Sequence, residues 1–264
     1  IRKVTKTEKP CDEKCYEYLI STFVHPLCLP SFVWVDLSGT VYIADSGDMV
    51  IEQIMPGSAN SMTFAGEKAM VSSGFFDSGD GNVATSALFN TPWSIISDTQ
   101  GNFYISDQGS NVIRKIAAGS NIVSTIGGDG MFAYSGDNGP ATSASMAQPG
   151  DLWMDMSGNL YFADTKNHRI RVISMSSGMI HTVAGVGQSP FAGSFSGDGG
   201  LAVNAELFQP FGVWGDSVGS LFIADTFNNR VRKVMGISGI IMTVAGNGAG
   251  GYNGDNMAAT SSSL

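Results

Sequence analysis

The sequence predicts an all-β protein made of tandem four-stranded units, and three observations support this prediction. One 16-residue string occurs four times in slightly varied form, at 39–54, 101–116, 158–173 and 219–234. Glycine makes up 34 of the 264 residues, well above its usual share of about 7%, which indicates many tight turns. Short apolar runs lie between these turns, and no apolar pattern of period 3.6 persists beyond a turn or two.

Several independent markers give the length of the repeat. The second apolar run of each copy ends in an aspartate, namely Asp45, Asp107, Asp164 and Asp225. A proline series keeps the same spacing of 57 to 62 residues, with Pro30, Pro92, Pro149 and Pro210. A threonine series begins one copy earlier, at Thr22, and its first interval, to Thr63, is only 41 residues. The basic unit is therefore about 40 residues long, and the other units carry an insertion of roughly 20.

Each unit is predicted to contain four strands, for example 211–216, 221–224, 230–234 and 240–244. Gly, Asn and Asp between them supply the tight turns. The first strand is apolar at almost every position, as expected for a strand covered on both faces. Trp34, Trp153 and Trp214 share one position in this strand, with Ile96 in the remaining unit, and we expect them to pack in the core.

Tandem four-stranded antiparallel units of about 40 residues are the blades of a β-propeller. We expect a single propeller segment with a partial blade at 1–28, blades at about 29–83, 84–140, 141–201 and 202–258, and the start of a next blade at 259–264. Because the chain begins and ends inside repeats, we expect it to be a piece of a larger protein. The complete ring would hold five or six blades, and we favour six.

The string YFADTKNHRI at 161–170 resembles the signature of NHL repeats, with Arg169 in the third place of the Asn-His-Leu triplet. The adjoining TVAG at 182–185 and SGDGG at 196–200 are similar to the long-loop NHL variant of large extracellular and microbial proteins. In the first full unit the likeness weakens. There Glu52 stands where other units have an arginine, at Arg114, Arg171 and Arg232.

Charge and composition exclude several classes of protein. The net charge of −9 argues against nucleic acid as a partner. No run approaches the roughly 18 apolar residues of a membrane span, so this segment is not expected to insert into a membrane. Three cysteines, Cys11, Cys15 and Cys28, are disulfide candidates or inert thiols, and their spacing is a poor zinc signature.

In a blade, the turn after the second strand and the long insertion emerge on the same face. This face should be acidic and rich in aromatic residues, and loops clustered on a rigid scaffold are where binding usually resides. We therefore predict the binding residues to be Asp80, Asp137, Asn138, Asp198, Asp255, Tyr134, Phe195 and Tyr252. The insertions lack the spaced oxygens of a calcium loop, so we predict no cofactor or metal, with calcium as a minor possibility.

The repeated signature residues are expected to be structural. They are the strand-terminal aspartates Asp45, Asp107, Asp164 and Asp225, the arginines Arg114, Arg171 and Arg232, and the turn residues Asn167 and His168. An aspartate that ends a strand normally accepts bonds from amides of its turn. The arginines are expected to pair with these aspartates or to lie between blades.

Catalytic motifs are missing from the sequence: there is no nucleophile elbow, no HExxH and no phosphate loop. We therefore predict a non-catalytic binding or assembly module. It would be a rigid scaffold that contacts other domains, copies of itself or glycans within a larger extracellular or cell-surface protein. One alternative is a divalent-ion-dependent propeller hydrolase or lyase, which requires aspartates that converge on the central channel. Another is a structural subunit of an extracellular fibre or coat.

Overall fold

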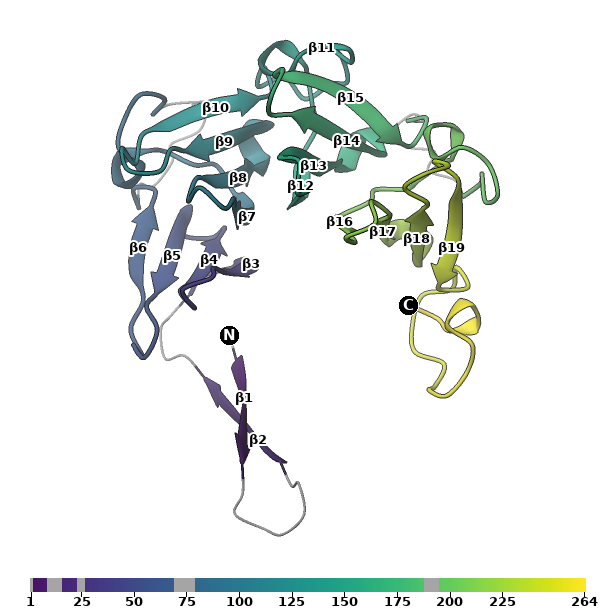
Figure 1. Ribbon diagram of the computed structural model, residues 1–264, viewed down its shortest axis with the longest axis horizontal. Coiled ribbons are helices and arrows are strands. Elements are labelled where there is room, and N and C mark those ends of the chain that lie inside the picture. Colours follow the sequence, from purple (N-terminus) through teal and green to yellow (C-terminus); the bar gives the residue numbers. More distant parts are fainter. Residues whose placement is uncertain (1, 9–15, 23–26, 69–78, 188–194) are drawn as a thin grey trace.

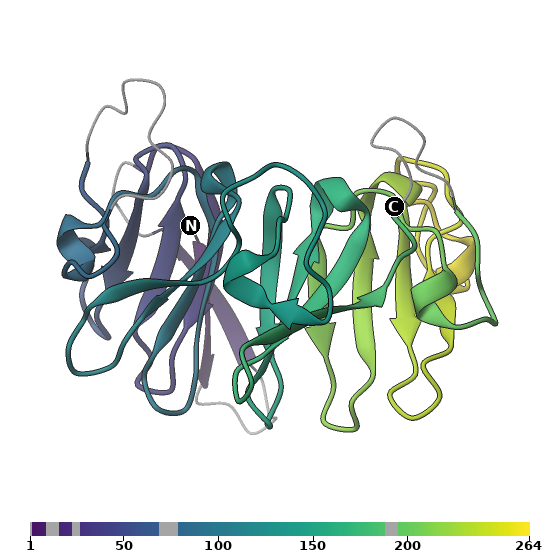
Figure 2. The ribbon, with the colours of Figure 1, turned by 90° about the horizontal axis from the view of Figure 1, so that it is seen from above.

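The computed structural model describes residues 2–8, 16–22, 27–68, 79–187 and 195–264. It confirms the all-β prediction, with four antiparallel sheets of four strands arranged as propeller blades in an arc. The first strand of each blade faces the centre of the arc and the fourth lies outermost (Figure 1). Seen from above, the four sheets stand side by side (Figure 2).

The strands follow the repeat. Blade 1 contains β3 (Pro30–Val35), β4 (Val41–Asp45), β5 (Val50–Ile54) and β6 (Met62–Ala65). Blade 2 contains β7 (Pro92–Ser97), β8 (Phe103–Asp107), β9 (Val112–Ile116) and β10 (Val123–Gly127). Blade 3 contains β12 (Pro149–Met154), β13 (Asn159–Asp164), β14 (Arg169–Ser174) and β15 (Met179–Ala184), with the two-residue β11 (Gly139–Pro140) at the edge of β15. Blade 4 contains β16 (Gly212–Gly215), β17 (Leu221–Asp225), β18 (Arg230–Val234) and β19 (Ile241–Ala245).

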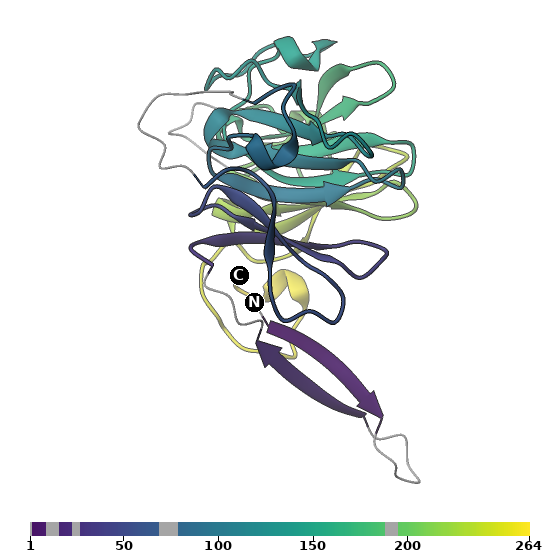
Figure 3. The ribbon, with the colours of Figure 1, turned by 90° about the vertical axis from the view of Figure 1, so that its left-hand side faces the viewer.

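A separate two-stranded hairpin precedes blade 1. It pairs β1 (Arg2–Glu8) with β2 (Tyr16–Thr22) and extends away from the four blades (Figures 1 and 3). Its register places position 2 opposite position 22. The third and fourth strands of the full blades pair in the same register, for example Arg171 opposite Thr182.

The described residues also form seven short 3-10 helices. Three occupy the turn after the second strand: η2 (Gln108–Ser110), η4 (Thr165–Asn167) and η6 (Thr226–Asn228). Four follow the insertions: η1 (Ala84–Ser86), η3 (Ala141–Ser143), η5 (Ala202–Asn204) and η7 (Ala259–Ser261). In the part of the chain that the structure describes, no helix has the length and apolar character needed to cross a membrane.

The hydrophobic core lies between the blades rather than within them. Three clusters of buried residues join blades 1 and 2, blades 2 and 3, and blades 3 and 4. Trp34 packs on the first cluster and its indole N–H donates to Ser97 of blade 2, while Trp153 packs on the third. The core prediction is wrong for Trp214, which is 58% exposed because no described blade covers that side of blade 4.

A glycine after the fourth strand brings the chain back against the turn of its own blade. Gly66, Gly128, Gly185 and Gly246 all have φ between +89° and +97°. A Cβ on Gly185 would overlap the carbonyl oxygen of His168, and one on Gly246 would overlap that of Asn229. Only glycine combines this left-handed backbone with so close an approach.

We expect Gly185→Ala to lower the free energy of unfolding by roughly 2–4 kcal/mol, because it adds a steric overlap to backbone strain. Gly178→Ala is the matched control, since its φ is +70° and nothing lies within 4 Å of the added carbon. It should cost only about 1 kcal/mol. Urea unfolding followed by tryptophan fluorescence measures both. Equal losses would contradict the close-approach argument.

Candidate functional site

A buried arginine marks the third strand of blades 2, 3 and 4. The side chains of Arg114, Arg171 and Arg232 are fully buried, and each lies between two aspartates. In blade 3, the guanidinium of Arg171 lies 2.7 Å from Asp137 and 3.2 Å from Asp164. Blade 4 repeats this geometry with Asp198 at 2.7 Å and Asp225 at 3.3 Å from Arg232.

The outer aspartate of each cluster comes from an insertion that leaves the preceding blade. It lies 34 residues before its arginine in all three cases: Asp80 with Arg114, Asp137 with Arg171, and Asp198 with Arg232. Its second oxygen accepts the backbone N–H of the threonine on the neighbouring fourth strand, at 3.0 Å from Thr182 in blade 3. The insertion therefore crosses to the outer strands of the next blade and holds the two blades together.

The inner aspartate ends the second strand and holds the start of its own blade. Asp164 accepts the backbone N–H of Ala147 at 2.8 Å and two bonds from the side chain of Asn167. The equivalent carboxylates accept from Cys28, Asn90 and Phe208. Burial raises the pKa of Asp164 to about 6, although the charge of Arg171 opposes the shift. Burial also raises the pKa of Asp225.

In blades 3 and 4 the pKa of the outer aspartate shifts in the opposite direction. Burial alone would raise the pKa of Asp137, but bonds from Thr182 and the charge of Arg171 hold this pKa below its ordinary value. Asp198 behaves in the same way with Thr243 and Arg232. At neutral pH the clusters of blades 3 and 4 thus keep an ionised outer carboxylate against the buried guanidinium.

The predicted binding residues of the middle insertions lie in these same contacts. Tyr134 stacks on Arg169, with the guanidinium carbon 3.6 Å from the ring centre, and its hydroxyl donates to Asp137. Phe195 stacks on Arg230 at 3.8 Å. The backbone N–H of Asn138 donates to Ile180 of the fourth strand. Tyr252 is different, since it is 78% exposed, and Asp255 beside it is also exposed.

Blade 1 has the opposite charge at the arginine position. Glu52 is 2% exposed, accepts from the Thr63 hydroxyl and lies 3.3 Å from the ammonium of Lys68, which also pairs with Asp48. The cation here comes from the chain that leaves β6. Blade 1 follows the short 41-residue interval, so no insertion delivers an aspartate to it, and a glutamate with its own lysine replaces the arginine.

His168 and its equivalents join the turn of one blade to the start of the next. His168 is buried, has φ of +57°, and its Nδ1 accepts the backbone N–H of Gln209 at 2.9 Å. In blade 2 the side-chain amide oxygen of Asn111 accepts the backbone N–H of Gln148 in the same way. Burial lowers the pKa of His168, and the nearby charges of Lys166 and Arg169 lower it further.

One carboxylate on the inner strands was missed by the sequence analysis. Asp151 on β12 accepts from the hydroxyl of Ser94 on β7, and burial raises its pKa to about 6. Beside it, the rings of Trp93 and Phe211 lie 5.4 Å apart. The sequence feature that could have identified Asp151 is an acidic residue in a strand that is otherwise apolar. The aspartates that end the second strands, in contrast, accept bonds from backbone amides, and those of blades 2, 3 and 4 also face an arginine.

Cysteines and acidic side chains are the groups that could bind a cation or form a disulfide. Within the described ranges, no group of three or more His, Cys, Asp or Glu side chains is arranged to hold a metal ion. Cys28 is an exposed free thiol. Cys11 and Cys15 lie outside the described residues, so their pairing stays a prediction.

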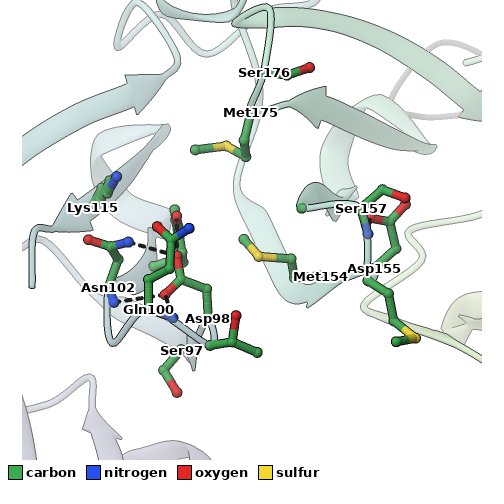
Figure 4. A pocket seen from close by; sticks show the side chains of 14 residues that line it. Ser97, Asp98, Gln100, Asn102, Lys115, Met154, Asp155, Ser157, Met175 and Ser176 are labelled. Atoms are coloured by element: carbon green, nitrogen blue, oxygen red, sulfur yellow. Dashed lines mark hydrogen bonds between the residues drawn. The ribbon is translucent and has the colours of Figure 1, made fainter.

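A hollow of about 560 Å³ lies between blades 2 and 3, at the ends opposite the insertions. Met154 and Met175 point into it between two turns that are closed by Asp98 and Asp155 (Figure 4). Both aspartates accept bonds from their own turns, at 2.8 Å from Asn102 and Asn159. The rim carries Lys115 and Met156, and Met156 is 98% exposed. This hollow can therefore receive an apolar side chain.

Fold and repeat geometry together define a β-propeller whose blades are tied by Asp–Arg–Asp clusters. No protein-family model matches the chain. Two relatives are 25% identical over 80% of the chain: Protein SUPPRESSOR OF QUENCHING 1, chloroplastic, of Arabidopsis thaliana, and NHL repeat-containing protein 2 of Homo sapiens. NHL repeat-containing protein 2 of Bos taurus is 30% identical over 49% of the chain. These relatives, with the repeat signature and the blades, support an NHL-repeat β-propeller.

The chain spans only 20% of the length of the Arabidopsis relative and 32% of that of the human one. Among solved structures, an auxiliary nutrient binding protein from Bacteroides thetaiotaomicron matches 91% of the chain and 52% of its own, with a TM-score of 0.61 and 13% identity. A streptogramin B lyase matches 92% of the chain and 58% of its own, with a TM-score of 0.53 and 13% identity. At these identities the likeness shows the fold alone.

We expect Arg171→Met to lower the free energy of unfolding by roughly 3–5 kcal/mol, because it leaves the buried Asp164 without its counter-charge. Lys233→Met removes a partly exposed cation whose nearest carboxylate is 3.9 Å away, and should cost under about 1 kcal/mol. Adding Asp164→Asn to Arg171→Met should recover part of the loss. Chemical unfolding of the four proteins tests this, and a loss for Arg171→Met no larger than that for Lys233→Met would contradict it.

His168 should make the fold sensitive to acid. Its folded pKa lies below the ordinary value of 6.5, so the unfolded chain takes up the proton first and stability falls as the pH drops through about 6.5. His168→Asn keeps the acceptor used by Asn111 and should remove this dependence. We expect the stability of the parent relative to the variant to decline from pH 7.5 to 5.5. Parallel stability curves would contradict the assignment, because the raised pKa values of Asp151 and Asp164 act equally in both proteins.

Proposed function

We propose that the chain is a non-catalytic binding and assembly module, a rigid propeller scaffold within a larger protein that contacts other protein domains. The repeated charged residues support this proposal, because they already bond to one another and to the backbone. The buried arginines and the carboxylates around them stabilise the turns and the contacts between neighbouring blades. We therefore propose a structural role for these residues, not a chemical one.

The hollow between blades 2 and 3 is the contact surface that the geometry favours. Methionine side chains adapt to irregular apolar partners, which suits a surface for protein recognition. The flanking turns are rigid because Asp98 and Asp155 each accept several bonds from their own turn. Lys115 at the rim adds one positive charge. We propose that a partner segment inserts an apolar side chain here and places an acidic group near Lys115.

The partners and the location of the protein remain predictions from the sequence. Glycan partners, contacts between copies in a fibre or coat, and a location outside the cell or at its surface derive from the family resemblance alone. The comparisons add only that one relative is chloroplastic by name. The proposal of a protein-binding scaffold does not depend on any of them.

The hollow can be tested with peptides selected from a displayed library against the 264-residue chain. We expect selected peptides to carry an apolar residue near an acidic one. Met154→Ala combined with Met156→Ala should weaken their binding at least tenfold by titration calorimetry, equivalent to about 1.4 kcal/mol. Met62→Ala is the matched control, because Met62 is 56% exposed on the outer strand of blade 1 and lies outside the hollow.

Two outcomes would contradict the proposal. Peptides that bind both methionine variants equally well would show that the hollow is not the contact surface. Ion-dependent turnover of an ester or glycoside substrate, abolished by a chelator and by Asp151→Asn, would favour the propeller hydrolase or lyase instead.

A further inference from the structure

We propose that the outer edge of β6 in blade 1 binds a basic, extended segment of a partner protein as an added antiparallel strand. The segment would occupy the place that the insertions occupy on blades 2, 3 and 4. It would carry a lysine or arginine where each insertion carries its aspartate. This site is separate from the hollow between blades 2 and 3.

The fourth strands of blades 2, 3 and 4 each have their outer edge covered by an insertion. In blade 4 the backbone N–H of Gly199 donates to Ile241, and the N–H of Ile241 donates to Gly200. Blade 2 has the same pair of bonds around Val123. In blade 3 the two-residue strand β11 pairs with β15 in the antiparallel direction. The repeat therefore shows what this edge accepts, which is a short antiparallel strand.

The outer edge of β6 has no such cover. In the part of the chain that the structure describes, β6 is the last strand of its sheet and pairs only with β5, and it lies at the outer margin of blade 1 (Figure 1). The connection before blade 1, residues 23–29, is too short to hold an insertion. The unpaired backbone groups of an edge strand are a template for another strand.

The backbone groups that an added strand would bind can be assigned from the repeat. The N–H of Thr182 in blade 3 faces outward and donates to Asp137. Thr63 has the equivalent register in blade 1, opposite Glu52, so its N–H lies on the outer edge of β6. Ser61 stands two residues earlier, as Ile241 stands before the threonine of blade 4. Its backbone N–H and carbonyl are therefore the groups that would bond to the new strand.

The charge beside this edge is inverted relative to the other blades. Glu52 takes the position of the buried arginine and is 2% exposed. The ammonium of Lys68 lies 3.3 Å from Glu52 and 3.0 Å from Asp48, so two carboxylates share one cation. An arriving aspartate would be repelled here, whereas a lysine or arginine would supply the missing positive charge. Lys68 is half-exposed and could stay on Asp48 while the new cation pairs with Glu52.

A hollow of about 470 Å³ opens beside the same strand, between the outer parts of blades 1 and 2. It is lined by Gln53, Thr63 and Phe64 of blade 1, and by 83–85 and 120–121 on the side of blade 2. Successive side chains of a strand point to opposite faces. One set of side chains from an added strand would enter this hollow, so the edge offers space for side chains as well as backbone bonds.

A synthetic peptide tests the proposal. Residues 196–204, SGDGGLAVN, include the part of an insertion that pairs with blade 4, and the probe is this sequence with Asp198→Lys. Titration of the 264-residue chain with the probe should shift the NMR signals of the Ser61 and Thr63 backbone amides. The shifts should saturate with a Kd of about 1 mM or below. The unaltered aspartate peptide is the matched control and should bind at least tenfold more weakly.

Variants of blade 1 separate strand addition from a purely structural role. Ser61→Pro removes an edge N–H, which an edge strand tolerates, and should abolish the saturable shifts, whereas Ser61→Ala keeps this N–H and should bind the probe as the parent does. Glu52→Gln should weaken probe binding at least threefold, and Lys68→Met should strengthen it because the competing cation is gone. A structural role alone would not change affinity in opposite directions.

Three results would overturn the proposal: equal binding of the two peptides, probe binding that survives Ser61→Pro in a folded protein, or no saturable shift at about 5 mM probe. If Ser61→Pro fails to fold, the opposite effects of Glu52→Gln and Lys68→Met decide, and affinities unchanged in both would overturn the proposal. Met154→Ala with Met156→Ala should leave probe binding unchanged, so this test and the test of the hollow between blades 2 and 3 can fail independently.

Discussion

A buried guanidinium between two carboxylates is the interaction on which the rest of this propeller depends. Burying ions costs several kcal/mol each, and the cost is offset only where geometry and extra hydrogen bonds are good. Arg171 satisfies this condition with two aspartates and two backbone carbonyls, from Ser135 and Ser145. The carboxylates reach it from its own blade and from the insertion of the blade before. In blades 2, 3 and 4, one arginine thereby couples the turn, the outer strands and the neighbouring blade.

Blade 1 shows what happens when one part of this arrangement is removed. Where no insertion arrives, Glu52 takes the arginine position and Lys68 supplies the cation from the exit of the same blade. The polarity of the ion pair is reversed, while the strand register of glutamate opposite threonine is kept. The charge cluster is therefore matched to the insertion, whereas the four-stranded sheet does not require it. Ile51 and Ala65 of blade 1 still pack with Ile95 of blade 2 in the first hydrophobic cluster.

The repeat pattern was enough to predict the sheets, because strand position and turn chemistry depend on residues close together in the sequence. The contacts of side chains whose partners lie in another blade were harder to predict from the sequence. A carboxylate and an arginine 34 residues apart meet only because the insertion crosses between blades, and no local pattern gives that path. Tyr134 and Phe195 are aromatic residues on a loop, the usual signal for binding, yet they stack on arginines. Trp214 differs from its equivalents because its cover would come from a neighbour, and the hollow arises from two turns that no single repeat contains.

The crossing insertions also determine which segment of the chain can be duplicated or lost as one repeat. A segment cut at the edges of one sheet carries an aspartate whose arginine belongs to its neighbour, so it is incomplete alone. The same segment is complete when it is repeated in tandem, since the aspartate of each copy pairs with the arginine of the next copy. Duplication of whole units would lengthen such a chain without creating an unpaired buried charge, whereas loss of half a unit would leave one. The ion pairs between blades thus favour the gain and loss of whole repeats over the gain and loss of partial ones.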